Sequence, residues 1–388
     1  MPVKVSPTLS SSASPVSLRA LKFCLSARSL FLYTFSLIYE ANLRNATFDR
    51  AILFCVDLRC ADMSDVSMVR ADLRGASLKG ANLTGANMEG VDLREGALAS
   101  AGGSGELKSA HENLTVADKG GANLSGANLS GACLSGAVAI ESNFSDSTMR
   151  NAKISNAILR GANFSGANLE NADFSQCDLT NINLRDAILI GTAINLSEIP
   201  EADRQGALTS TPQGLSAKDL PRPIEQLVKL HEMWADSKGR SGQQLDISTF
   251  DLRGTANFQR ARLTMMKGVG AVLYAVNFSE SQLQAADLST ADLRHANFES
   301  ADMRGGNLSG AKFTNCSLQN ARLEPLSVAP GKLITTDLSQ ASLRFANLSG
   351  ANLRQVNFRD ADLRDANLMG ADMSDADLTG ANMTGVRR

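Results

Sequence analysis

Large apolar residues recur every five positions through most of this 388-residue chain. We call the apolar residue of each five-residue word position i. It recurs in three blocks, Leu43 to Leu98, Leu124 to Ile194 and Phe258 to Met383. Of these 53 positions, 51 are Leu, Phe, Met, Ile or Val, and the exceptions are Ala139 and Gly268. A period of five matches neither a helix nor a flat strand, so the pattern predicts a chain that coils.

The residues around position i predict a short extended side followed by a corner. Position i−2 is most often Ala and points to the same side as i, whereas i−1 is usually Asn or Asp and points away. Gly often stands at i+2, as in Gly75 and Gly126, where it tolerates the left-handed backbone of a tight turn. The pattern therefore predicts a solenoid with Ala and Leu inside, whose coils stack as parallel strands about 4.8 Å apart.

Several words resemble the A(D/N)LXX consensus of the pentapeptide repeat family, among them ADLRG at 71–75, ANLSG at 122–126 and ADMSD at 371–375. The resemblance covers about 265 of the 388 residues. It implies an all-β solenoid, a right-handed quadrilateral β-helix with four words per coil.

Two breaks in the period divide the chain. Residues 99–121 are Gly-rich and shift the phase by one residue, which predicts a surface loop between a first block, 40–98, and a second block, 122–196. These two blocks could still stack as one rod. Residues 197–246 predict a polar, Pro-containing linker with an amphipathic helix over about 221–238, and the third block follows at 247–388.

The helix is predicted to cap the third block. Pro221 and Pro223 suit its start and Gly239 suits its end. One helical face carries its apolar residues and a histidine: Ile224, Leu227, Val228, His231 and Trp234. The end of a β-helix exposes unpaired backbone and an apolar cross-section, which such a face can cover. Trp234 and His231 are therefore candidate interaction residues, and a partner-binding helix is the alternative interpretation.

The N-terminal segment, residues 1–39, is basic, Ser-rich and without Asp or Glu. Its apolar run at 29–39 is shorter than the roughly 20 residues of a membrane span. We predict either a helix that caps the repeats, an organellar targeting peptide, or a secretory signal or over-extended start. The first interpretation predicts a cytoplasmic protein without a membrane span.

No group of residues in the sequence suggests catalysis. The three histidines, His111, His231 and His295, lie in different structural contexts, and the six cysteines show no metal-ligand spacing. Most acidic residues occupy i−1, where they point outward from a convex rod. We therefore predict no enzyme, no metal site and no cofactor.

The charge pattern favours a protein partner over nucleic acid. The net charge is −2, and no basic stripe with interleaved aromatic residues occurs. We predict a non-catalytic rigid scaffold or protein-interaction surface with an unknown protein partner. The alternative is a DNA mimic that binds DNA gyrase or another topoisomerase, as some pentapeptide repeat proteins do.

Alternating charges argue against that mimicry. Arg often follows Asp two residues later, as in Asp57/Arg59, Asp72/Arg74, Asp92/Arg94, Asp292/Arg294, Asp302/Arg304 and Asp362/Arg364. Such neighbours cancel beyond about 10 Å. Residues 40–388 carry 40 acidic and 34 basic side chains, which is a weak field over so long a rod.

The C-terminal repeats predict an exposed end. The words run to Met383, so the interior residues Leu368, Met373, Leu378 and Met383 are expected to form one exposed layer. Leu378 and Met383 are candidate interaction residues. We predict a head-to-head homodimer through residues 361–388, because an unpaired strand edge recruits a partner. The alternative is that polar residues around this end, among them Arg387 and Arg388, keep the protein monomeric.

Overall fold

The structure is a computed structural model that describes residues 40–96, 99–101, 107–109 and 121–388. The predictions for residues 1–39 and the position of His111 lie outside the described residues. The chain divides into two compact units, unit 1, which ends at Ser210, and unit 2, which runs from Thr211 to Arg388.

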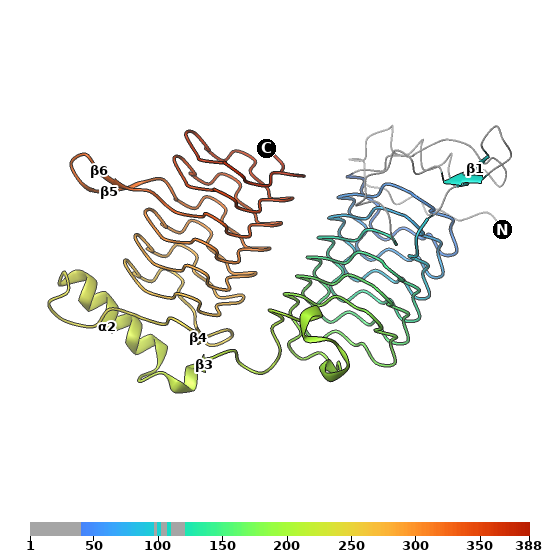
Figure 1. Cartoon of the computed structure of the whole chain (residues 1–388), viewed down its shortest axis with the longest axis horizontal. Helices are drawn as coiled ribbons and strands as arrows, with labels where there is room; N and C mark the ends of the chain where they lie inside the picture. The colour runs from blue at the N-terminus through green and yellow to red at the C-terminus, as the bar shows by residue number, and fades with distance from the viewer. Residues whose placement is uncertain (1–39, 97–98, 102–106, 110–120) are drawn as a thin grey trace. The chain divides into compact units, whose positions relative to one another are not determined.

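Each unit is a right-handed quadrilateral β-helix, which confirms the predicted all-β solenoid (Figure 1). Parallel bridges join residues 20 positions apart, such as Asn42 with Asp62, so one coil holds four words. Each bridge is built from backbone hydrogen bonds: the Leu43 amide donates to the Asp62 carbonyl at 2.7 Å, and the Asp62 amide donates to the Ala41 carbonyl at 2.9 Å. Bridges therefore follow the outward i−1 positions from coil to coil.

Positions i and i−2 fill the interior as predicted. Ala71 and Leu73 are buried, and aromatic residues at equal positions of successive coils stack, with 4.7 Å between the ring centroids of Phe278 and Phe298. Gly268 stands at an i position, and the fully buried Met266 two residues earlier provides the larger side chain instead. The interior thus keeps its volume when the small and large positions are exchanged.

The i−1 Asn and Asp residues do more than face solvent. The side-chain oxygen of Asn143 accepts a hydrogen bond from the Ser145 amide at 3.0 Å, and this i−1 to i+1 bond recurs in most words. Asn163 also donates to Asn143 in the coil below at 3.3 Å. The word therefore needs Asn or Asp at i−1 because a short side chain there satisfies the first amide of the corner.

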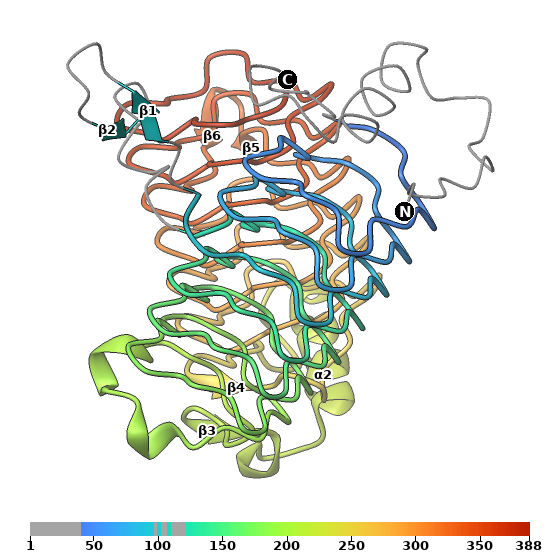
Figure 2. The same ribbon diagram turned by 90° about the vertical axis from the view of Figure 1, so that its right-hand side faces the viewer.

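The first two repeat blocks form one stack, unit 1 (Figure 2). Ser77 pairs with Asn123, 46 positions later rather than 20, and Asp92 pairs in the same way with Val138. The chain between them holds a small antiparallel hairpin of strand β1 (Ala99–Ala101) and strand β2 (Leu107–Ser109). The extra 26 residues are not a multiple of five, which accounts for the shift of phase.

The residues after the second block, as far as Ser210, do not form a linker. They cover the last coil of unit 1. Two short 3-10 helices, η2 (Leu196–Glu198) and η3 (Glu201–Asp203), fold back onto its last coil. Ile199 between them is buried in the core of unit 1, and Leu208 pairs with Ile188. The predicted polar linker is therefore wrong as far as Ser210, because this stretch buries apolar side chains and continues the parallel pairing.

Unit 2 begins with a segment outside the repeats. Strand β3 (Leu215–Ser216) pairs in parallel with strand β4 (Phe250–Asp251), and between them lie η4 (Ala217–Asp219) and helix α2 (Ile224–Asp236). The helix lies inside the predicted range of 221–238 and starts directly after Pro223. Figure 1 shows α2 against the first coils of unit 2.

The third block contains a hairpin that the five-residue period did not predict. Strand β5 (Leu326–Ala329) pairs antiparallel with strand β6 (Lys332–Ile334), and the hairpin projects from the stack (Figure 1). Val328 and Leu333 were expected in the interior but are 47% and 56% exposed. The hairpin adds ten residues, so Asn307 pairs with Asp337 and the phase survives. The missed signals are Pro330-Gly331 at the turn and the absence of Ala or Cys at i−2 in both words.

Candidate functional site

The start of unit 2 is covered by α2 and β3. Ile224, Leu227 and His231 are the buried residues of α2, and the first two belong to the apolar core of unit 2. Strand β3 pairs with the backbone of β4, which belongs to the first coil of unit 2. Together they cover the apolar cross-section and one strand edge, as the predicted cap requires.

His231 lies at the centre of this cap. Its side chain is fully buried, and its Nδ1 atom accepts a hydrogen bond from the Leu245 amide at 3.0 Å. Burial lowers the pKa of His231, because a charged imidazolium loses its water, while the nearby backbone of Thr264 and Leu263 and the charge of Glu232 oppose this shift. The histidine is therefore a neutral hydrogen-bond acceptor in the folded chain.

Trp234 has a supporting position. It is half-buried and stacks on His231, with 5.4 Å between the ring centroids and 20° between the ring planes. At about 100° per residue, His231 lies between Ile224 and Leu227 on the helix, whereas Trp234 lies at the edge of that stripe. The helical spacing alone therefore identifies His231 as the central residue of the stripe.

The loop after α2 folds back on the helix. A Cβ atom on Gly242 would collide with the Leu230 carbonyl oxygen and lie 2.6 Å from the Trp234 amide nitrogen. The Gln243 amide donates to that same Leu230 carbonyl at 3.0 Å. Only glycine fits this approach, so the Gly-containing stretch after the helix is part of the cap.

An ion pair ties α2 to the wall of the stack. Arg262, at an outward i−1 position, donates two hydrogen bonds to the Asp236 carboxylate, at 2.6 and 2.9 Å. Its Nε atom also lies 4.0 Å from Glu232. Both carboxylates are on α2, so the pair fixes the C-terminal half of the helix.

Two hollows in the described surface do not suit a substrate. One beside the cap, lined by residues that include Leu220, Leu227 and Phe250, has a volume of about 50 Å³. Ligand pockets usually have about 300–1,000 Å³. The other, of about 280 Å³, lies open on unit 1 between Arg74, Arg94 and Glu141. Its charges are of both signs, so it does not select an anion or a cation.

The last coil of unit 2 is exposed, in contrast to the start. Met373, Leu378 and Met383 pack on the core from one side and are only partly buried. Val386 joins them at an i−2 position. Within the described residues, the Met373, Leu378 and Met383 amides have no acceptor in a following coil, whereas the equivalent Leu353 amide donates to Asp372 at 2.7 Å.

Leu368 does not belong to this exposed layer. It is 3% exposed, and its amide donates to the Arg387 carbonyl at 2.7 Å. The prediction is wrong at this residue because Leu368 lies one coil earlier, and the strand around Arg387 completes the coil above it. The exposed layer is therefore formed by Met373, Leu378, Met383 and Val386.

Many of the outward charges of the repeats form ion pairs. All six predicted Asp–Arg neighbours form ion pairs, with 2.6–2.8 Å between the closest atoms in the five exposed or partly exposed pairs. The sixth pair, Asp292 and Arg294, is buried. Hydrogen bonds from Arg74 lower the pKa of Asp72, so its carboxylate stays charged and paired. Unit 2 carries 19 acidic and 20 basic residues in 211–388, so it has no net acidic field.

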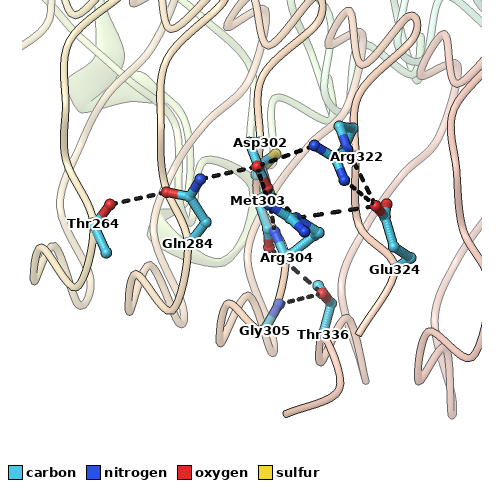
Figure 3. A network of polar contacts seen from close by, with 9 residues as sticks. All are labelled: Thr264, Gln284, Asp302, Met303, Arg304, Gly305, Arg322, Glu324 and Thr336. Carbon is cyan, nitrogen blue, oxygen red and sulfur yellow. Dashed lines mark hydrogen bonds and ion pairs between the residues drawn. The ribbon is translucent and has the colours of Figure 1, made fainter. Parts of the chain in front are cut away.

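A polar network on one face of unit 2 shows the same balance (Figure 3). Asp302 accepts hydrogen bonds from Arg304 at 2.8 Å and Gln284 at 2.9 Å, and Arg322 lies 3.6 Å away. Arg322 also pairs with Glu324 at 2.6 Å. Two acids and two arginines neutralise one another, so the network braces neighbouring coils and presents no excess charge.

Beside the network, Thr336 anchors the end of the hairpin. It accepts a hydrogen bond from the Gly305 amide at 2.9 Å.

Across the described residues, no group of three or more His, Cys, Asp or Glu side chains is arranged to hold a metal ion. No helix in the described part of the chain is long and apolar enough to cross a membrane.

The repeats match a family model for pentapeptide repeats in eight copies, over residues 39–68, 57–94, 122–161, 162–197, 256–294, 291–324, 332–360 and 346–385. The chain belongs to the pentapeptide repeat family. Membership supports a repeat scaffold or interaction protein and leaves the partner open. No curated protein sequence matches this pentapeptide repeat chain.

Solved structures of other pentapeptide repeat proteins are similar. HetL, involved in heterocyst differentiation regulation in the cyanobacterium Nostoc, is 20% identical over 89% of this chain and 90% of its own, with a TM-score of 0.24. QnrB1, a plasmid-mediated fluoroquinolone resistance protein, is 15% identical over 65% and 82%, with a TM-score of 0.24. A protein of the Arabidopsis thaliana thylakoid lumen is 25% identical over 38% and 70%, with a TM-score of 0.16. At these low TM-scores the likenesses carry no argument about function.

Proposed function

We propose that this chain is a non-catalytic scaffold that presents rigid polar faces to protein partners and associates with a second copy through the last coil of unit 2. Family membership supports the scaffold role. The convex faces support a non-catalytic role, because a general acid or base must lie within hydrogen-bond reach of a bound substrate and the hollows described above do not suit one. The exposed last coil supports the self-association.

The observation that carries the proposal is the contrast between equivalent interior residues. Leu353 and Leu363 are fully buried, whereas Leu378 and Met383 in the last coil are partly exposed beside unpaired backbone amides. An apolar strand edge of this kind recruits another strand. A second copy offers the same edge, and a two-fold contact closes after two copies.

Charges around the last coil fit such a two-fold contact. The backbone at Asp372 forms a parallel β-bridge with Asn352. The backbone at Arg387, three words later, forms one with Asn367 on the neighbouring face. A two-fold axis through the corner between these faces brings Asp372 of one copy opposite Arg387 of the other, twice. Opposite charges at the rim then favour this register over a contact that brings like charges together.

Light scattering on the full chain tests the proposal. We expect a dimer at high micromolar concentration. Asp372→Arg places two arginines together and should weaken the dimer at least tenfold, whereas Asp372→Arg with Arg387→Asp restores the opposite charges and the dimer. A monomeric wild-type chain would contradict the proposal, and a dimer that ignores both variants would place the contact elsewhere.

The alternative function, a DNA mimic that binds gyrase, needs a continuous acidic face. The Asp–Arg pairs and the balanced charge of residues 211–388 weigh against that alternative. A gyrase supercoiling assay with and without a quinolone separates the two functions. Protection of gyrase from the drug would favour the mimic, and no effect at a large molar excess of this chain is expected for the scaffold.

A further inference from the structure

We propose that α2 is a proton-sensitive cap, which leaves the first coil of unit 2 when His231 becomes protonated. The proposal concerns the closed start of unit 2 and does not depend on self-association at the other end. It rests on the position of one buried histidine and on the hydrogen bond that it accepts.

The hydrogen bond to His231 fixes its charge state. The Leu245 amide points at Nδ1 with 3.0 Å between the two nitrogens. Nδ1 must therefore carry a lone pair, and the single ring proton of the neutral side chain sits on Nε2. An imidazolium carries N–H groups on both nitrogens. Protonation would turn the Leu245 contact into two donors facing each other inside a site that water does not reach.

The surroundings of His231 compensate only part of the added charge: the backbone of Thr264 and Leu263 and the charge of Glu232 act to raise its pKa, but burial outweighs them. Its Nε2 atom is buried and has no hydrogen-bond partner among the described residues. Glu232 on α2 is the carboxylate that acts on the ring, and Arg262 on the stack faces Glu232 at 4.0 Å. Asp246 follows Leu245 but is exposed. Asp236 is already bound by Arg262 at 2.6 Å. Among the described residues, no carboxylate therefore forms a hydrogen bond with the ring.

The direction of the pH effect follows from this geometry. Released from the coil, His231 has an ordinary pKa near 6.5, and burial lowers the pKa of the attached form. The contribution of neutral His231 to attachment is fully present above about pH 6.5. Below that pH, attachment weakens by up to about tenfold per pH unit until the pKa of the buried ring is reached. Release would then uncover interior residues of the first coil such as Phe258 and Leu263.

The only tryptophan of the chain reports directly on this cap. Since Trp234 stacks on His231, we expect its emission to shift to longer wavelength, and its quenching by iodide to rise, as the full chain is taken from about pH 8 to about pH 5. Far-ultraviolet circular dichroism of the β-helix should stay constant over this range, because release of α2 leaves the backbone hydrogen bonds between the coils in place.

Two variants separate His231 from other groups. His231→Asn keeps a neutral acceptor oxygen close to the position of Nδ1 and cannot be protonated in this range, so its Trp234 emission should not change with pH. His295→Asn should keep the wild-type transition. A wild-type emission that stays constant, or a transition of equal size in His231→Asn, would overturn the proposal.

Hydrogen exchange on the wild-type chain tests whether α2 leaves the first coil, even if His231→Asn fails to fold. Protection at pH 5.5, corrected for intrinsic exchange, should fall in residues 224–247 and persist in the coils from residue 270 onward. Unchanged protection of 224–247, or an equal loss throughout unit 2, would overturn the proposal.

Discussion

The two ends of unit 2 are built from the same repeat, yet one is closed and the other is open. At the start, β3 pairs with β4 and α2 buries Ile224, Leu227 and His231 against the first coil. At the other end, Leu378 and Met383 stay partly exposed. The difference lies in the segment before the repeats, since residues 211–243 supply the cap. The repeats build the interior, and the chain outside them decides which end is accessible.

The largest effect should come from the same substitution at the two kinds of coil. Leu353→Arg places a charge in an interior that is fully closed, at a cost of several kcal/mol, and should unfold unit 2. Leu378→Arg lets the charge reach solvent, so unit 2 should stay folded and lose only its contact with a second copy. Thermal melts and light scattering measure the two outcomes.

Arg354→Ala is the matched control for Leu353→Arg, because Arg354 is the exposed neighbour of Leu353. It should change the free energy of unfolding by about 0.5 kcal/mol or less. Equal losses in Leu353→Arg and Leu378→Arg would show that the last coil is as enclosed as the interior, which would remove the contrast.

A glycine substitution tests how closely the cap is fitted. Gly242→Ala drives a Cβ atom into the Leu230 carbonyl at a left-handed position (φ 81°), and should reduce stability by about 1–3 kcal/mol. Gly254→Ala has a similar left-handed backbone (φ 69°) but open space around the added carbon, so it should lose only about 1 kcal/mol. Urea unfolding followed by Trp234 fluorescence compares them, and equal losses would mean that the loop does not hold α2.

The ion pair of the cap should contribute least. Arg262 and Asp236 are both substantially exposed, so a double-mutant cycle with alanine should give a coupling below about 1 kcal/mol. The exposed pair of Arg364 and Asp362 near the open end should give a similar value. A much larger coupling at Arg262 would mean that charge, rather than the buried face of α2, attaches the cap.

The sequence predicted the interior well because each word satisfies one local rule. Large residues at i, small ones at i−2 and short polar ones at i−1 specify side and corner without help from distant parts of the chain. The same rule misplaced Val328 and Leu333, since the hairpin β5–β6 adds ten residues to its coil and so preserves the phase. It also gave no account of residues 196–208, whose apolar side chains close unit 1 outside the period.

The candidate site was predicted in outline only. The helix and its role as a cap followed from periodicity, but His231 owes its central place to the Leu245 amide, which no local pattern connects to it. Leu378 and Met383 lie in the exposed layer as expected. Leu368 does not, because the strand around Arg387 covers it, and the sequence pattern did not show that this strand continues the stack.

Hydrogen exchange at several protein concentrations tests most directly the claim that unit 2 is closed at its start and available for self-association at its end. We expect residues 371–388 to exchange rapidly in dilute solution and to become protected at high micromolar concentration, while protection of residues 224–263 does not depend on concentration. Concentration-dependent protection in 224–263, or none in 371–388, would contradict it.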